Sequence, residues 1–141
     1  MLAFLLVGGA AFGATRHCDG GRCKGTDEAD KIYVSEGDDV VFADAGSDKV
    51  FGRGGEDVLK GDSDDDHVYG EEDNDRVKGG PGRDMVFGGP GDDMVRGGTH
   101  DETNDGVRDV LDCGEGTADS VYYTPGVDVI RDCEIFHPPK Q

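Results

Sequence analysis

Apolar side chains recur along the chain in short groups separated by polar, glycine-rich segments. Each group has an aliphatic residue in the middle, and the middle residues lie nine positions apart. They are Ile32, Val41, Val50, Leu59, Val68, Val77, Val86 and Val95. Because alternate side chains of a strand point to opposite faces, each group predicts a three-residue strand with its middle side chain directed inward. The pattern therefore predicts an all-β fold built from repeats.

Polar positions keep the same period, and the repeats run unbroken over residues 25–96 as eight units, from GTDEADKIY to GGPGDDMVR. Place six of the unit is always aspartate: Asp30, Asp39, Asp48, Asp57, Asp66, Asp75, Asp84 and Asp93. Place one is glycine in six units. Place four is glycine in five units and, at Asp64 and Asp73, an aspartate, which tolerates a left-handed backbone well. Each unit thus predicts a tight turn followed by a strand.

The register breaks after Arg96 at an insertion, residues 97–103, and resumes over residues 104–141. Place six is then Asp109, Asp119 and Asp128, and place eight is Leu111, Val121 and Ile130. Cys113 is read as a single extra residue between the first two of these units. We expect the repeats to continue past a bulging loop and to end in a C-terminal cap.

The 141 residues carry 14 Lys and Arg against 32 Asp and Glu, a net charge of −18. This charge argues against nucleic acid and anionic membranes as direct partners. An acidic chain with 25 Gly and no Trp is either disordered or an ordered array whose carboxylates meet cations. The fixed register of the aspartates favours the ordered array.

Residues 1–13 carry no charge, and the apolar stretch from Leu2 to Phe12 is too short to span a membrane. They are interpreted as a secretion signal peptide, with Ala11 and Gly13 at the small-residue positions of a cleavage site before Ala14. The alternative is a buried first strand. The signal predicts a secreted, extracellular protein without a membrane span.

The units resemble the RTX, or haemolysin-type, calcium-binding repeat G-G-x-G-x-D-x-U-x, in which U is a large apolar residue. The resemblance is tight over residues 25–96, and the segment DGVRDVLDCG followed by CE is similar to the ends of actinobacterial secreted proteins with such repeats. The family implies a parallel β-roll or β-helix solenoid with two units per turn. It also implies Ca²⁺ between turns stacked eighteen residues apart.

Carried onto this sequence, the resemblance implies a ligand set at the turns. Its members are Asp39, Asp48, Asp57, Asp66, Asp75, Asp84, Asp93, Gly52, Gly55, Gly61, Asp64, Gly70, Asp73, Gly79, Gly82, Gly88 and Gly91. Carboxylates and glycine carbonyls are hard oxygen ligands, which calcium prefers. The best sites are expected around Gly61 to Asp93, and the chain is expected to be largely unfolded without calcium. The alternative is a metal-free acidic solenoid.

Four cysteines in a short exported chain predict disulfides, with three possible connectivities. The favoured pairing joins Cys18 to Cys23 in a small loop within an N-terminal cap, residues 14–24. It joins Cys113 to Cys133, whose spacing of twenty residues is close to one turn of the implied roll. A zinc site made by His17, Cys18 and Cys23 is the rival, but no fourth ligand is evident.

With two units per turn, place nine separates into two rows. One row is Tyr33, Phe51, Tyr69 and Phe87, and the other is Phe42, Lys60, Lys78 and Arg96. The aromatic row is interpreted either as cross-strand stacking or as a face for a protein or cell-envelope partner. The second alternative makes the protein an adhesin-like binding protein.

The sequence gives no support for an enzyme. The four His, at positions 17, 67, 100 and 137, have no triad-like or metal-helix spacing. Adjacent acids such as Asp92 and Asp93 are better explained as turn ligands than as an acid and base pair. We expect a calcium-binding structural or interaction module.

Overall fold

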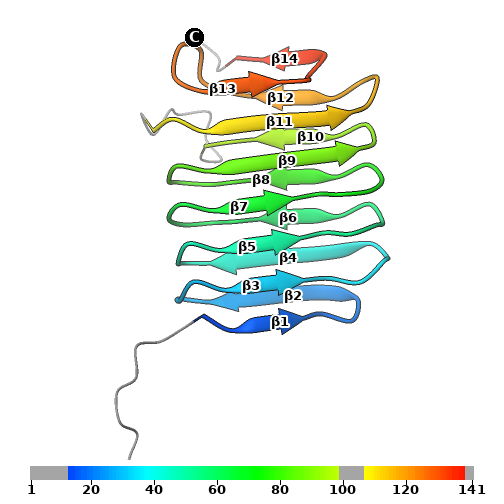
Figure 1. Ribbon diagram of the computed structural model, residues 1–141, viewed down its shortest axis with the longest axis vertical. Coiled ribbons are helices and arrows are strands. Elements are labelled where there is room, and N and C mark those ends of the chain that lie inside the picture. Colours follow the sequence, from blue (N-terminus) through cyan, green and yellow to red (C-terminus); the bar gives the residue numbers. More distant parts are fainter. Residues whose placement is uncertain (1–12, 99–106, 139–141) are drawn as a thin grey trace, which may run out of the picture.

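A computed structural model describes residues 13–98 and 107–138, and within them the chain forms fourteen strands in two parallel sheets (Figure 1). The odd sheet contains β1 (Thr15–His17), β3 (Lys31–Tyr33), β5 (Lys49–Phe51), β7 (His67–Tyr69), β9 (Met85–Pro90), β11 (Val110–Glu115) and β13 (Val129–Arg131). The even sheet contains β2 (Gly21–Thr26), β4 (Asp39–Asp44), β6 (Val58–Lys60), β8 (Arg76–Lys78), β10 (Met94–Arg96), β12 (Ser120–Tyr122) and β14 (Ile135–His137). The predicted all-β parallel solenoid is confirmed.

The chain alternates between the two sheets, so each full turn contains two units. Along the odd sheet Val50 pairs with Val68, and along the even sheet Leu59 pairs with Val77, each eighteen residues further on. This spacing confirms the expected stacking of every unit on the second unit after it. Figure 1 shows the result as a ladder of short strands joined by turns at both edges.

The core is a narrow double column of aliphatic side chains between the sheets. The place-eight residues from Ile32 to Val95, together with Leu111 and Val121, are almost completely buried. Their neighbours at places seven and nine point outward and are exposed or half-buried. The strands end where glycines and acidic residues force the chain to turn, so the polar chemistry gathers at the edges.

The stacking continues across the insertion. Gly97 accepts a hydrogen bond from the N–H of Gly80, and Leu111 of β11 pairs with Val86 of β9. Gly97 and Gly98 are described, whereas the rest of the expected insertion, residues 99–103, lies outside the described residues. The insertion therefore sits within one turn of the solenoid.

The structure corrects the register that the sequence suggested around Cys113. Gly114 pairs with Gly89, which holds place two, so Cys113 itself stands at place one with its side chain buried. The extra residue lies instead in the following turn, where the N–H groups of Thr117 and Ala118 both donate to Asp92. A turn absorbs an extra residue more easily than a paired strand, because the strand would shift every side chain to the other face.

Disulfides close both ends of the solenoid, as the favoured pairing predicted. Cys18 is bonded to Cys23 and Cys113 to Cys133, and no described cysteine is free. The paired sulfurs leave no thiolates for the rival zinc site at His17. The expected signal peptide lies outside the described residues apart from Gly13, and no helix among the described residues is long and apolar enough to span a membrane.

The aromatic row forms a continuous stack on the odd sheet. Ring centroids are 4.8 Å apart between Tyr33 and Phe51, 5.0 Å between Phe51 and Tyr69, and 4.9 Å between Tyr69 and Phe87. His17 extends the stack at 5.3 Å from Tyr33. The cross-strand stacking that the sequence suggested is thus present, and the partner face stays a prediction.

Candidate metal sites in the turns

The place-six aspartates lie at the two edges of the solenoid and are buried in spite of their charge. Each is at most 3% exposed: Asp30, Asp39, Asp48, Asp57, Asp66, Asp75, Asp84, Asp93, Asp109 and Asp119. The motif period places one aspartate just before every strand, so each edge collects a column of carboxylates. A buried carboxylate is costly unless hydrogen bonds or a cation compensate its charge.

Hydrogen bonds link the aspartates of one column to one another. The backbone N–H of Asp48 donates to Oδ1 of Asp66 at 2.8 Å, and the N–H of Asp66 donates to Oδ1 of Asp84 at 2.9 Å. The other column repeats this pattern, with Asp57 donating to Asp75 at 2.8 Å. Each carboxylate therefore has one oxygen satisfied by the preceding turn.

The second oxygen is the exception. In the part of the chain that the structure describes, a buried carboxylate oxygen has no hydrogen-bond donor in Asp39, at Oδ1, and in six further aspartates, at Oδ2. These six are Asp48, Asp57, Asp66, Asp75, Asp93 and Asp119. Because an unsatisfied buried carboxylate oxygen is strongly unfavourable, a row of them at equivalent positions indicates a missing positive partner.

The electrostatics of these carboxylates agree with the hydrogen-bond pattern. Burial is the main cause that raises the pKa of Asp48, Asp57 and Asp75 to about 7, that of Asp66 to about 8 and that of Asp93 to about 6. Neighbouring aspartates of the same columns raise them further. The folded chain without a cation thus favours protonated carboxyl groups near neutral pH.

Place one is glycine because Oδ2 of the place-six aspartate lies against it. A Cβ built on Gly61 would overlap the Asp66 carboxylate, and the same holds for Gly79 with Asp84. Gly52, Gly70 and Gly88 have the same relation to the aspartates of their own units. The glycines keep open the space at the carboxylate that a side chain would otherwise fill.

Places two and four of the central units adopt the left-handed backbone. At place four the φ angle is +140° at Gly82 and +79° at Asp64, and at place two it is +74° at Asp62. A Cβ on Gly82 would also overlap the carbonyl oxygen of Asp64 one turn below. Stacked turns thus bring backbone carbonyls close to the carboxylate columns.

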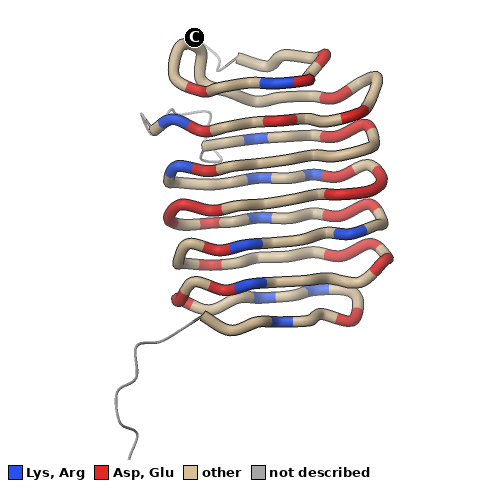
Figure 2. Tube along the Cα trace, in the orientation of Figure 1, with Lys and Arg blue, Asp and Glu red and all other residues tan. Residues whose placement is uncertain are grey.

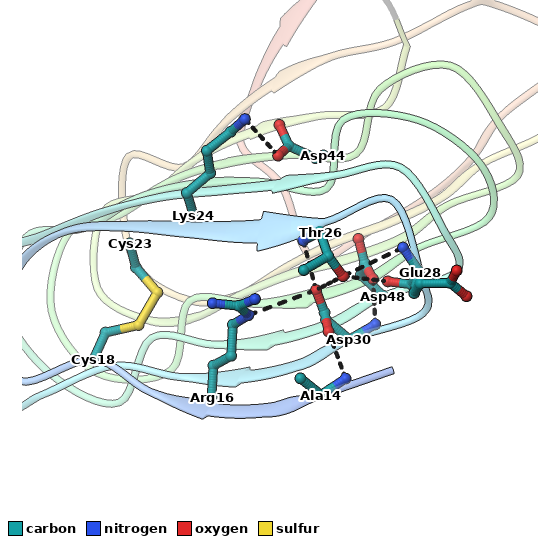
Figure 3. A network of polar contacts seen from close by, with 10 residues as sticks. All are labelled: Ala14, Arg16, Cys18, Cys23, Lys24, Thr26, Glu28, Asp30, Asp44 and Asp48. Carbon is teal, nitrogen blue, oxygen red and sulfur yellow. Dashed lines mark hydrogen bonds and ion pairs between the residues drawn. A yellow bond between two sulfur atoms is a disulfide. The ribbon is translucent and has the colours of Figure 1, made fainter. Parts of the chain in front are cut away.

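The first turn has a different arrangement, in which protein groups satisfy both oxygens of Asp30 (Figure 3). Oδ1 accepts the N–H of Ala14 at 2.7 Å, and Oδ2 accepts the N–H and the hydroxyl of Thr26 at 2.7 and 2.8 Å. The Arg16 side chain adds a positive charge, with Nε 3.8 Å from Oδ2. This carboxylate needs no cation.

Two further units satisfy Oδ2 of their aspartate with a donor from place two, although Oδ1 of Asp39 is buried without a donor. Ser35, at place two of its unit, donates its N–H at 3.1 Å and its hydroxyl at 2.7 Å to Oδ2 of Asp39. Near the other end the N–H of Thr124 donates to Oδ2 of Asp128 at 2.6 Å. In the last turn Glu134 replaces the place-six aspartate and accepts the N–H of Asp119 at 3.0 Å.

The donor set fits a hard cation that takes both carboxylate and carbonyl oxygens. Buried oxygens without donors, glycines that leave space beside them and carbonyls in the same turns are the features that such an ion requires. Within the described ranges no three His, Cys, Asp or Glu side chains come together as a metal cluster. Side chains alone therefore do not make the site, and backbone oxygens have to complete it.

The structure brings most of the residues in the sequence-based ligand set to the two edges, in the expected order. Asp39 differs in which oxygen is satisfied, since Ser35 donates to its Oδ2 and its buried Oδ1 has no donor. Asp119 was not in that set, although its second oxygen is as buried and unsatisfied as that of Asp66. The signal was its place-six position, which is visible in the sequence beyond the segment where the motif is tight.

A family model for the RTX calcium-binding nonapeptide repeat, which holds four copies of the repeat, matches residues 24–59, 51–86 and 69–101. These matches together span residues 24–101, more than half of the 141 residues. Searches of the curated proteins and of the solved structures give no significant match.

Proposed function

The chain belongs to the family of RTX calcium-binding nonapeptide repeats, and on this basis we propose that it is a secreted structural or interaction module whose folding is coupled to Ca²⁺ binding in its turns. The observation that carries the proposal is the row of buried carboxylate oxygens without donors in the central units. When bound, calcium supplies positive charge and accepts several oxygen ligands at once.

The proposed ligands are the carboxylates of the central columns. They are Asp48, Asp57, Asp66, Asp75, Asp84, Asp93 and, beyond the motif match, Asp119. Glycines of the motif from Gly52 to Gly91, with Asp64 and Asp73, shape the turns so that carbonyl oxygens complete each site. We leave out Asp39, because Ser35 donates to its Oδ2, the oxygen that has no donor in Asp57 and Asp66.

Coupling to folding follows from the electrostatics of the columns. Like-charged carboxylates at successive turns repel one another, and burial adds a desolvation cost for each ionised group. The narrow aliphatic core offers little to offset these costs. Without calcium at neutral pH the central turns are therefore expected to unfold, and the cation binds the folded state only.

A calcium titration of the oxidised chain from Ala14 onward tests the proposal, with far-UV circular dichroism for folding and calorimetry for stoichiometry. The matched variants are Asp66→Asn and Asp30→Asn, which remove one charge at the same motif place in a central and in the first turn. The expected result is fewer bound ions and a higher midpoint for Asp66→Asn only. A chain that is already β-rich in chelator at about pH 8, or equal effects of both variants, would falsify the proposal.

Secretion is the second part of the proposal. Two disulfides are typical of an oxidising compartment outside the cytoplasm, where calcium is also abundant. The uncharged residues 1–13 supply the expected export signal. Expression of the full chain in a secreting host, followed by mass measurement of the exported product, should give a protein that begins at Ala14. A product that retains residues 1–13 inside the cell would count against export.

The adhesin-like alternative uses the aromatic row on the odd sheet. The rings of Tyr33, Phe51, Tyr69 and Phe87 are only partly buried, but their faces contact one another, so a partner would meet ring edges. Phe51→Ser with Phe87→Ser should then abolish retention on cell envelopes while calcium-dependent folding persists. Retention that survives both substitutions rules this alternative out.

A further inference from the structure

The outer face of the even sheet is rich in basic residues in a protein that is acidic overall. Fourteen side chains point outward at places seven and nine of its seven strands, and none is acidic, although the chain has 32 Asp and Glu. Six of them are basic: Arg22, Lys24, Lys60, Arg76, Lys78 and Arg96. In Figure 2 most acidic residues lie at the turns, and most basic residues lie in the straight segments between them. We call this face the basic strip.

The basic residues of the strip are neighbours in the sheet register. Lys60 pairs directly with Lys78, and Lys78 pairs with Arg96, while Arg76 lies on the same strand as Lys78. Like charges directly opposite one another in a sheet are destabilising. The chain has many acidic residues that could stand opposite these basic ones, yet none does. Stability of the fold therefore does not explain the arrangement.

The contacts of Lys60, Arg76 and Arg96 in the structure leave these three residues positively charged. Lys24 forms an ion pair with Asp44 at 2.9 Å. Lys60 lies over the ring of Phe42, and Arg96 lies over the ring of Tyr122, so both keep their positive charge. Arg76 is exposed. The strip therefore presents several cations to the solvent along one line.

The dimensions of the strip select the kind of anion. Strands lie about 4.8 Å apart, so seven strands extend about 29 Å along the solenoid axis, whereas places seven and nine are about 7 Å apart across it. Turns with Asp62, Asp64, Glu71 and Asp73 border the strip on both sides. A single extended polymer strand fits between these acidic borders. A double helix is wider and would contact the acidic residues, which repel it.

We propose that the basic strip binds a linear acidic polysaccharide, laid along the solenoid axis with its carboxylates against Lys60, Arg76 and Arg96. A polysaccharide is favoured over single-stranded nucleic acid because the disulfides indicate an extracellular setting. The inference rests on the proposed calcium binding in one respect. Cations in the turns reduce the repulsion that the acidic borders exert on the ligand.

The test measures binding of the oxidised chain in calcium to carboxymethyl cellulose, with hydroxyethyl cellulose as the uncharged polymer on the same backbone. Binding is expected for the first polymer alone and should weaken as sodium chloride rises. Circular dichroism of each sample reports folding separately, so a chain that fails to fold in calcium contradicts the proposed function, and a folded chain that fails to bind overturns this inference.

Two triple variants locate the site. Lys60→Gln, Arg76→Gln and Arg96→Gln remove three charges from the strip, and Lys31→Gln, Lys49→Gln and Arg53→Gln remove three from the other side of the molecule. The strip variant should lose affinity by on the order of tenfold and show a weaker salt dependence, whereas the control should change by less than about twofold. Equal losses in both variants overturn the assignment to the strip, and tighter binding of poly-dT than of carboxymethyl cellulose overturns the assignment to polysaccharide.

Discussion

Asp66 and Asp30 occupy the same place in the repeat and are both buried, yet their surroundings differ in one respect. Asp30 has both oxygens satisfied by Ala14, Thr26 and Arg16, whereas Asp66 has one oxygen bonded and one without a donor. The central turns thus require an external cation, and the first turn supplies its own donors. An aspartate at place six is therefore not a metal ligand in every unit.

Both ends have a donor at place two that the central turns lack. Ser35 donates to Oδ2 of Asp39 and the N–H of Thr124 donates to Oδ2 of Asp128, and a disulfide closes each end. A solenoid whose central turns depend on calcium still has terminal turns that the protein itself holds. We expect the terminal turns to protect the open ends of the sheets while the centre responds to the ion.

The largest expected effect is the response of the calcium-free chain to pH. The raised pKa values of Asp48, Asp57, Asp66, Asp75 and Asp93 mean that the folded state binds protons more tightly than the unfolded state. Protonation therefore stabilises the fold fully below about pH 4, and this contribution is lost as the pH rises through about 6 to 8. Far-UV circular dichroism in chelator should show β structure near pH 5 that disappears by pH 8.

A calcium-saturated sample serves as the control and should remain folded at the alkaline end of the series. Equal β content in chelator at about pH 5 and at about pH 8 would mean that the central carboxylates do not govern folding. That result would contradict the proposed difference between the central and the terminal turns.

Disulfide removal compares the two ends with each other. Cys113 and Cys133 are separated by 20 residues and Cys18 and Cys23 by 5, so the first bond restricts the unfolded chain more. Paired serine substitutions should lower the free energy of unfolding by about 3 kcal/mol at the C-terminal bond and about 2 kcal/mol at the N-terminal bond. Urea unfolding in saturating calcium measures both. The reverse order would show that the N-terminal cap contributes more than loop closure explains.

Place four offers a matched pair of glycines. Gly82 has a φ of +140° and faces the carbonyl of Asp64, whereas a Cβ on Gly37 meets nothing within 4 Å. Gly82→Ala should destabilise the protein by about 1–3 kcal/mol from backbone strain and also raise the calcium midpoint. Gly37→Ala should leave both quantities nearly unchanged. Calcium titration and urea unfolding of the two variants check this. Equal effects would mean that the left-handed turn at Gly82 contributes no more to stability and calcium binding than the end turn at Gly37.

The smallest effect concerns the hydroxyl of Thr26. Thr26→Val removes one donor to Asp30 and should reduce the free energy of unfolding by about 1 kcal/mol without changing the calcium stoichiometry. Thr117→Val, at an exposed hydroxyl, is the control. An extra calcium ion bound by the Thr26 variant would instead mean that the cation can replace the hydroxyl, which would sharpen the comparison between the two kinds of turn.

Much of the fold follows directly from the repeat. The spacing of the aliphatic residues from Ile32 to Val95 predicts the strands, and the family resemblance implies their pairing eighteen residues apart, which the sheet register confirms. The disulfide pairing also agrees with expectation. The register at Cys113 was wrong by one residue, because the sequence does not indicate whether a strand or a turn accepts an insertion.

The aspartates of the candidate site could be picked out from the sequence, but the differences in their hydrogen bonding could not. Place-six aspartates are visible in the sequence, and Thr26, Ser35 and Thr124 were a signal that place two of those units does not adopt the usual left-handed backbone. Their meaning depended on the direction of each hydroxyl and N–H, which a repeat alignment does not give.

The sequence by itself determined the period, the inward and outward faces of each strand and the columns of aspartate at the turns, because these depend only on spacing along one chain. The tertiary structure decided which carboxylate oxygens have donors, since the donors of Asp66 and Asp30 come from turns that folding brings together. It also collected the basic residues of every second unit into one acid-free face, because two units make one turn.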